Sequence, residues 1–285
     1  MALVVEAFTT SAFAESTQVT ITKPTGTVNG ELLIVAIAGE PGGGGFVNSV
    51  PSGWTLAKQE TSDNCTYLYY KIASSEGASW VWGFDASNAC GGGCLRVSGA
   101  KASGPLDQAN SGLVNDDATP TFTSADIDPT TLASLFVMVA HSTDTADRTI
   151  SGYAIVTNNP TWTEHFNITD GGLSSVHSSL AVATAVRAQD TASGDPSYVI
   201  DSGGGGADGR LVIANFKVES DVTVSPAVID LTFSVQAPSI TGGANVTPSV
   251  VDITVAIQAP TVTTPANDWT NQNKNTASWV NQTKN

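Results

Sequence analysis

The chain has 285 residues with a formal net charge of −15 at pH 7, and only 13% of its residues are charged. An acidic surface repels phosphate backbones, so we expect no nucleic-acid binding. No apolar run approaches the roughly 18 residues that suggest a membrane-spanning helix, so we expect no membrane insertion.

The predicted elements are all strands. Residues 3–8 form the first predicted strand. This segment is interpreted as a strand rather than a signal peptide, because Glu6 interrupts its apolar run and no cationic side chain precedes Lys23. Continuous apolar runs, typical of strands buried between two layers, lie at 31–39, 135–141 and 179–186. β-Branched and aromatic runs predict further strands at 17–23, 65–72, 79–85 and 210–218. Segments rich in Gly, Pro, Asn and Asp predict turns at 40–45, 62–64, 85–93, 157–160 and 202–209.

The two halves of this strand pattern resemble each other. In both, a buried strand leads to a Trp-Thr pair, then to two more strands, a Gly-rich turn and a last strand. The pairs Trp54-Thr55 and Trp162-Thr163 are 108 residues apart. We expect one antiparallel β-sandwich, jelly-roll-like and internally duplicated, in which each half supplies alternating strands to two packed sheets. Segment 104–132 is expected to join the halves. Two separate small domains are the alternative.

Three segments carry a resemblance to a known kind of protein: KPTGTVNGELL at 23–33, PSGWT at 51–55 and YYKIASSEGASW at 69–80. In this order they resemble a jelly-roll-like β-sandwich module of tailed-phage and related virion proteins. The resemblance covers about residues 1–219. It implies an architecture more than an activity, because similar modules occur in bacterial surface and carbohydrate-associated proteins.

Two near-copies of one strand follow the sandwich, at 224–241 and 246–263, within a predicted repeat segment 220–263. Alternation places the apolar side chains of each copy on one face. A pair of strands is marginal in water, so we expect these faces to pack against the same segment of other chains in a homo-oligomer, with a trimer favoured. Docking of two ordinary strands on the sandwich is the alternative. The predicted assembly residues are Ile229, Leu231, Phe233, Val235, Val251, Ile253, Val255 and Ile257.

The last segment, 264–285, is rich in Asn and Gln and repeats the pattern W-x-N-Q-x-K-N. Trp269 and Trp279 are its only aromatic residues. Tryptophan is enriched as an interface anchor. Because short repeats of this kind resemble terminal segments of phage structural proteins, we predict an attachment tail. A disordered polar tail is the alternative.

Candidate chemistry is sparse. The odd number of cysteines, Cys65, Cys90 and Cys94, argues against a disulfide framework, and CGGGC alone is weak for metal binding. His141 lies near Asp144 and Asp147 in sequence, which suggests either a weak metal site or, as we favour, a solvated histidine. No G-x-S-x-G, H-E-x-x-H or dinucleotide-binding turn is present. We therefore expect no enzyme, no cofactor and no metal.

The aromatic residues leave one alternative function open. Tyr67, Tyr69, Tyr70, Trp80 and Trp82 lie on neighbouring predicted strands, where they form either the core, which we favour, or a sugar-binding platform. The sequence thus predicts a virion structural protein: a capsid decoration, head-fibre or tail-associated protein that contacts itself and capsid or tail proteins, with host-surface glycan adhesion as a secondary role. A carbohydrate-binding module of a secreted or cell-surface protein is the alternative.

Overall fold

The computed structural model describes residues 3–40, 46–62, 64–117, 121–124, 126–130, 134–173, 177–187, 194–200 and 207–218. They belong to one compact unit that ends at Asp221. Every regular element among them is a β-strand, which confirms the all-β prediction, and no helix that could cross a membrane is found there. The repeat segment 220–263 and the tail 264–285 lie outside the described residues.

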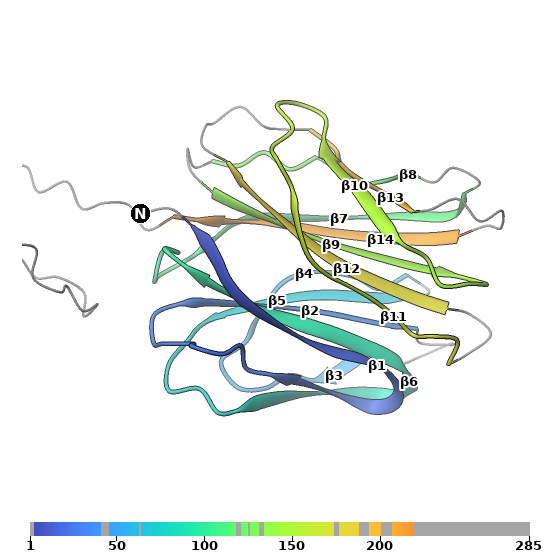
Figure 1. Cartoon of the computed structure of the whole chain (residues 1–285), viewed down its shortest axis with the longest axis horizontal. Helices are drawn as coiled ribbons and strands as arrows, with labels where there is room; N and C mark the ends of the chain where they lie inside the picture. Colours follow the sequence, from blue (N-terminus) through green and yellow to red (C-terminus); the bar gives the residue numbers. More distant parts are fainter. Residues whose placement is uncertain are drawn as a thin grey trace, which may run out of the picture. The chain divides into compact units, whose positions relative to one another are not determined.

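The first half of the unit builds one antiparallel sheet, in the order β1-β6-β2-β5-β4, with β3 also paired to β6 (Figure 1). Strands β1 and β6 are long and twist around each other as a bent pair, and β1 carries register shifts where the pair bends. The bounds are β1 (Val4–Thr22), β2 (Leu32–Glu40), β3 (Val47–Ser49), β4 (Thr55–Glu60), β5 (Cys65–Ile72) and β6 (Ser79–Ser98).

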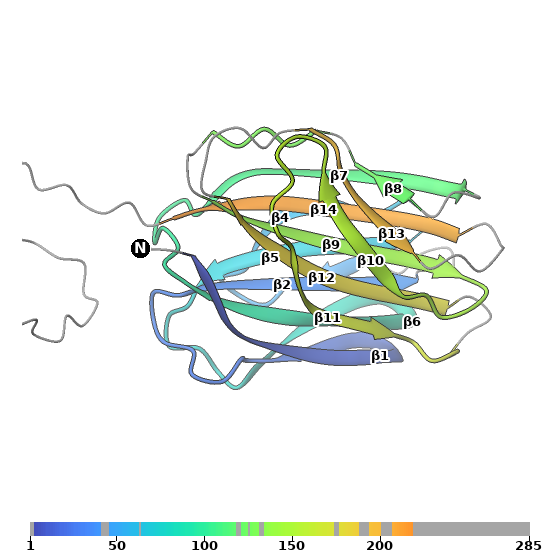
Figure 2. The ribbon, with the colours of Figure 1, turned by 45° about the horizontal axis from the view of Figure 1, so that its top comes forward.

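The second half builds a five-stranded antiparallel sheet, in the order β11-β12-β9-β14-β7, and a three-stranded sheet, in the order β10-β13-β8 (Figure 2). The bounds are β7 (Leu106–Asp117), β8 (Thr121–Thr123), β9 (Ser134–Asp144), β10 (Ile150–Ile155), β11 (Thr163–Thr169), β12 (His177–Arg187), β13 (Pro196–Ile200) and β14 (Ala207–Lys217).

The strand orders confirm the internal duplication. The large sheet of the first half, read from its edge strand β4, has the order β4-β5-β2-β6-β1. It corresponds strand by strand to the order β11-β12-β9-β14-β7 of the second half. The small sheet β10-β13-β8 matches β3, the first part of β6 and the second part of β1, which pair in the same order. Trp54 and Trp162 each directly precede the matching edge strands β4 and β11. The repeated sequence pattern is therefore a repeated topology.

Three details of the predicted layout are wrong. Each half forms its own large sheet instead of supplying alternating strands to both, because every strand of a large sheet finds its hydrogen-bonding partners within its own half. Segment 104–132 is no simple linker, since it contains β7, the counterpart of β1, and β8. Residues 85–93 are no turn but the middle of β6. The turn predicted at 157–160 does separate β10 from β11.

The two large sheets pack face to face over an inner core that includes Ile34, Leu95, Val137 and Val182. The edge strand β1 contacts β11, and β4 contacts β7, while the central strands β2 and β9 also meet. Because β7 is the counterpart of β1 and β4 is the counterpart of β11, the contact of β1 with β11 is equivalent to that of β7 with β4. This reciprocity is the hallmark of an isologous two-fold pair. The halves pack as two matching subunits would, joined here in one chain.

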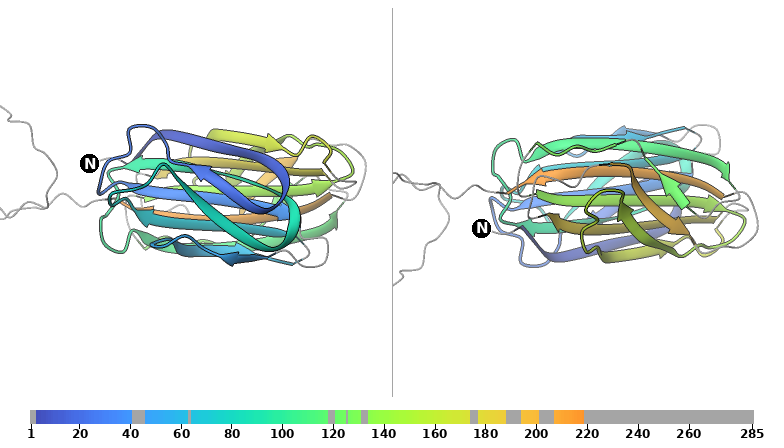
Figure 3. Two further views of the ribbon diagram at one scale, coloured as in Figure 1. Left: turned by 90° about the horizontal axis from the view of Figure 1, so that it is seen from below. Right: turned by 90° about the horizontal axis from the view of Figure 1, so that it is seen from above.

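Each large sheet has a second core on its outer face (Figure 3). In the first half, the bent part of the β1–β6 pair covers aromatic and aliphatic side chains that include Ile21, Leu33 and Trp82. In the second half, the small sheet lies obliquely over Phe136, Met138 and Ile213. Because both faces of β2 and β9 are covered, these strands read as continuous apolar runs rather than alternating ones.

Candidate functional site

The ten predicted assembly residues, from Ile229 to Trp279, all lie outside the described residues. Their packing and partners stay predictions. The candidate sites that the structure does describe are the aromatic cluster, the cysteines, the histidines and a group of side chains at one end of the second half.

The aromatic cluster is core. Trp82 is fully buried and Trp80 nearly so, and both meet the Trp54 ring edge-on, with centroids 5.2 and 5.1 Å away. Tyr67 and Tyr69 stack on each other below the surface. The remaining member, Tyr70, points to the other face of β5, where it packs against Phe216. These rings face the protein interior, so they present no sugar-binding platform.

The three cysteines are buried, and none forms a disulfide. Burial raises the pKa of Cys65 to about 12 and that of Cys90 to about 11, and it also raises the pKa of Cys94. A thiolate is the form that attacks electrophiles and binds metals, and burial disfavours it here. Within CGGGC, Cys90 and Cys94 both point into the outer core of the first half.

His141 is fully buried, so the favoured interpretation of a solvated histidine is wrong. It lies at the end of β9, in a polar network where the two sheets meet. Its Nδ1 is 2.9 Å from the Thr66 hydroxyl on β5, and its carbonyl accepts a hydrogen bond from Tyr198. Nearby, the Arg210 guanidinium donates to the Ser62 carbonyl at 2.7 and 2.9 Å. These contacts join the first half to the second.

This burial predicts a pH dependence of stability. Burial, and secondarily the charge of Arg210, lowers the pKa of His141 from 6.5 to about 3. In the unfolded chain the imidazole takes up a proton near pH 6.5, while the folded protein keeps it neutral. The contribution of His141 to the free energy of unfolding is therefore fully present above pH 6.5 and is lost as the pH falls towards 3. We expect a loss of about 2 kcal/mol between pH 6.5 and 5 from this group.

Denaturant unfolding of the wild type and of His141→Gln between pH 5 and 7.5 measures this effect. The variant should show a shallower loss of stability on acidification. The comparison is needed because His165, whose pKa burial also lowers, acts in the same direction. His177, whose pKa is raised chiefly by its hydrogen bond to Asp147, stabilises at low pH and loses that effect as the pH rises through its folded pKa. Parallel pH curves for the two proteins would refute the role of His141.

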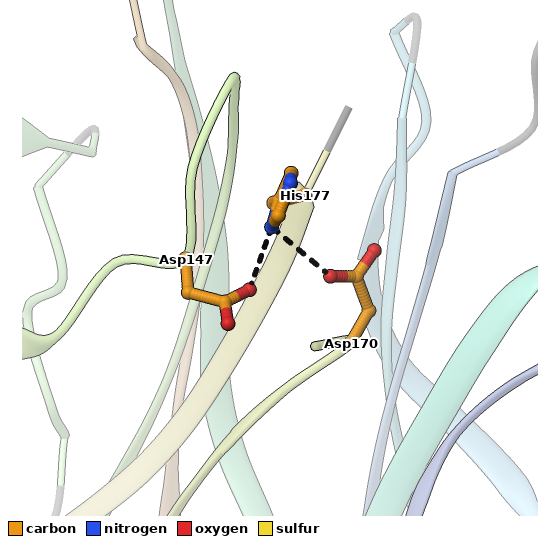
Figure 4. A group of neighbouring side chains, drawn as sticks. All are labelled: Asp147, Asp170 and His177. Carbon is orange, nitrogen blue, oxygen red and sulfur yellow. Dashed lines mark hydrogen bonds and ion pairs between the residues drawn. The ribbon is translucent and has the colours of Figure 1, made fainter. Parts of the chain in front are cut away.

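A cluster that sequence reasoning missed lies at one end of the second half (Figure 4). Asp147 comes from the connection between β9 and β10, Asp170 directly follows β11, and His177 opens β12. The Nδ1 atom of His177 lies 2.9 Å from Oδ1 of Asp147 and 3.7 Å from Oδ1 of Asp170. One potential metal-binding atom from each residue lies within 4.8 Å of the other two. The sequence suggested Asp147 together with His141, but the fold joins it to His177.

Asp144, the other predicted partner of His141, has a different role. Its carboxylate is buried and accepts two hydrogen bonds from the Arg148 guanidinium, at 2.6 and 2.7 Å. The Arg148 backbone N–H donates to the Ser179 hydroxyl. The ion pair links the two ends of the segment that contains Asp147, and the Ser179 hydrogen bond holds that segment against β12.

Comparisons with known proteins found no matching family model, no similar curated protein and no similar solved structure.

Proposed function

We propose that the protein is a structural component of a tailed-phage or related virion and acts by assembly rather than by catalysis. In this proposal the sandwich, about residues 1–219, projects as a capsid decoration, head-fibre or tail-associated module. Segment 220–263 joins copies of the chain, with a trimer favoured, and segment 264–285 attaches to capsid or tail proteins. Adhesion to a host-surface glycan is a secondary role.

The observation that carries the proposal is the pair of repeats at 224–241 and 246–263. Each has a stripe of alternating apolar residues that it cannot bury by itself. Burial of so few apolar side chains within a lone copy does not offset the conformational entropy lost when its residues are ordered. The sandwich supports the proposal indirectly, since the aromatic residues around Trp82 and the three cysteines are part of its own core.

The subunit count of the full chain tests the assembly step. Light scattering should give an oligomer, a trimer in the favoured case, for residues 1–285 and a monomer for residues 1–219. Leu231→Asp with Ile253→Asp places charge on both apolar stripes and should yield monomers. Thr232→Asp with Thr254→Asp adds the same charge to the opposite faces and should leave the oligomer intact. Equal subunit counts for the long and short chains would refute the proposed stalk.

The attachment step has its own test. Trp269→Ala with Trp279→Ala should keep the oligomer but abolish co-sedimentation with purified virions, because the tail loses both anchors. A carbohydrate-binding module would give different results. The full-length chain would be monomeric, and removal of residues 220–285 would leave its affinity for glycans unchanged.

A further inference from the structure

We propose that Asp147, Asp170 and His177 bind a divalent transition-metal ion, with Zn²⁺ the best match, and that this ion ties together two connections of the second half. The proposal goes beyond assembly and does not depend on it. All three residues lie in the sandwich.

The spacing of the ligand atoms fits a small ion. Zn²⁺ binds His nitrogen and carboxylate oxygen at about 2.0–2.2 Å, so the ligands of a tetrahedral site lie roughly 3.3 Å apart. The His177 Nδ1 atom lies 2.9 Å from the Asp147 oxygen and 3.7 Å from the Asp170 oxygen, on either side of that value. Figure 4 shows both carboxylates turned towards the same ring nitrogen. Three protein ligands would leave a fourth position for water.

An independent observation favours a cation at this cluster. The Asp170 side chain is fully buried, and its Oδ2 atom has no hydrogen-bond partner among the described residues. Its Oδ1 atom accepts the Gly172 N–H and faces His177, so the negative charge of this buried carboxylate is only partly compensated, which is unfavourable. The guanidinium of Arg148, on the same connection as Asp147, is engaged by Asp144. Two carboxylates thus share one imidazole, and a divalent ion would balance their charge.

The backbone positions the ligands in advance. The Gly172 N–H donates to Oδ1 of Asp170 at 3.0 Å and orients the carboxylate, and the Asp170 N–H donates to the Ser178 carbonyl at 2.9 Å and fixes the backbone beside β12. Gly172 has φ +81°, and a Cβ atom there would lie 3.0 Å from Cε1 of His177. Glycine therefore allows both the turn and the position of the ring. Hydrogen bonds of this kind orient metal ligands.

The ligand set selects the class of ion. One imidazole with two carboxylates suits Zn²⁺ and related first-row ions, whereas Ca²⁺ and Mg²⁺ prefer oxygen ligands alone. The ion would join the β9–β10 connection to the β11–β12 turn and to the start of β12. We therefore expect binding to raise the stability of the folded sandwich, since the unfolded chain does not hold the three residues together.

The test uses the full-length, tag-free chain, freed of metal and titrated with ZnCl₂. Equilibrium dialysis and elemental analysis should give one zinc per chain, and Tm should rise by roughly 3–5 °C at saturating zinc. Asp170→Asn and His177→Gln should each weaken zinc binding at least tenfold and remove the rise in Tm. His165→Gln, which removes a histidine of the same half outside the cluster, should bind zinc like the wild type.

Two further readouts separate a metal site from an ordinary ion pair. In the absence of metal, Asp170→Asn should be at least as stable as the wild type, because it removes a poorly compensated buried charge. Co²⁺ in place of Zn²⁺ should give the intense visible absorption of a tetrahedral site. No zinc-dependent change in the wild type, or zinc binding that survives both cluster substitutions, would overturn the proposal. A response to Ca²⁺ but not to Zn²⁺ would overturn the assignment of the ion.

Discussion

Replacement of Trp82 by alanine is expected to lower the free energy of unfolding by about 3–5 kcal/mol, one of the two largest effects foreseen for a single substitution in the sandwich. Trp82 lies on β6, opposite Val19 of β1, and is fully buried. Its ring meets Trp54 edge-on and lies 6.0 Å from the Tyr69 ring. The smaller side chain would leave a cavity among these rings, which the surrounding strands cannot close. Chemical denaturation of the purified variants measures the loss.

Two matched variants test whether the loss of stability in Trp82→Ala comes from this cavity. Val81→Ala changes the adjacent residue, whose side chain is 43% exposed on the other face of β6, and should cost less than 1 kcal/mol. Trp82→Phe keeps most of the apolar volume and removes a buried indole N–H that has no hydrogen-bond partner among the described residues, so it should cost much less than alanine. A stability of Trp82→Ala within 1 kcal/mol of the wild type would show that this outer core is not the close-packed layer described.

The alternation of residues predicted this face of β6 correctly. Trp80, Trp82 and Phe84 are buried, and Val81 between them is exposed, as period two requires. The buried strands β2, β9 and β12 were equally recognisable, since strands covered on both faces carry unbroken apolar runs. The matching Trp-Thr pairs also led to a true duplication. Local pattern was sufficient to recognise single strands and the faces that they bury.

Pairing between distant segments was harder to foresee. No period in the sequence tells which strands share a sheet, and so the assignment of strands to sheets was wrong. His141 looked like a strand-end residue near acidic turns, yet the packing of one sheet on the other buries it against Thr66. The grouping of Asp147, Asp170 and His177 could not be predicted from the sequence either. Their spacing matches no local motif, and only the pairing of β12 with both β9 and β11 brings them together.

The glycines of β6 were misread for a related reason. Three consecutive glycines are a strong turn signal, but glycine in a strand also marks a close approach of another backbone. Gly92 pairs with Ser11 of β1 and with Ile37 of β2, in the middle of the sheet. Its neighbour Gly93 leaves room for the Phe166 ring from the opposite sheet, since a Cβ atom there would lie 2.6 Å from that ring. The run is therefore a packing requirement of the sandwich.

Gly92→Ala consequently should destabilise the protein by about 3 kcal/mol or more, because one methyl group would overpack the centre of the first sheet. Its Cβ atom would lie 2.4 Å from the Ala36 carbonyl oxygen, a backbone atom that cannot move without distorting the pairing of β2 with β6. Gly77→Ala is the matched control, since the nearest atom to its Cβ lies 3.9 Å away, and it should change stability by less than about 0.5 kcal/mol. Thermal and denaturant unfolding of both variants measure the difference. Equal stabilities would mean that β2 and β6 are not paired at this register, and the duplicated sheet order inferred from that pairing would fall with it.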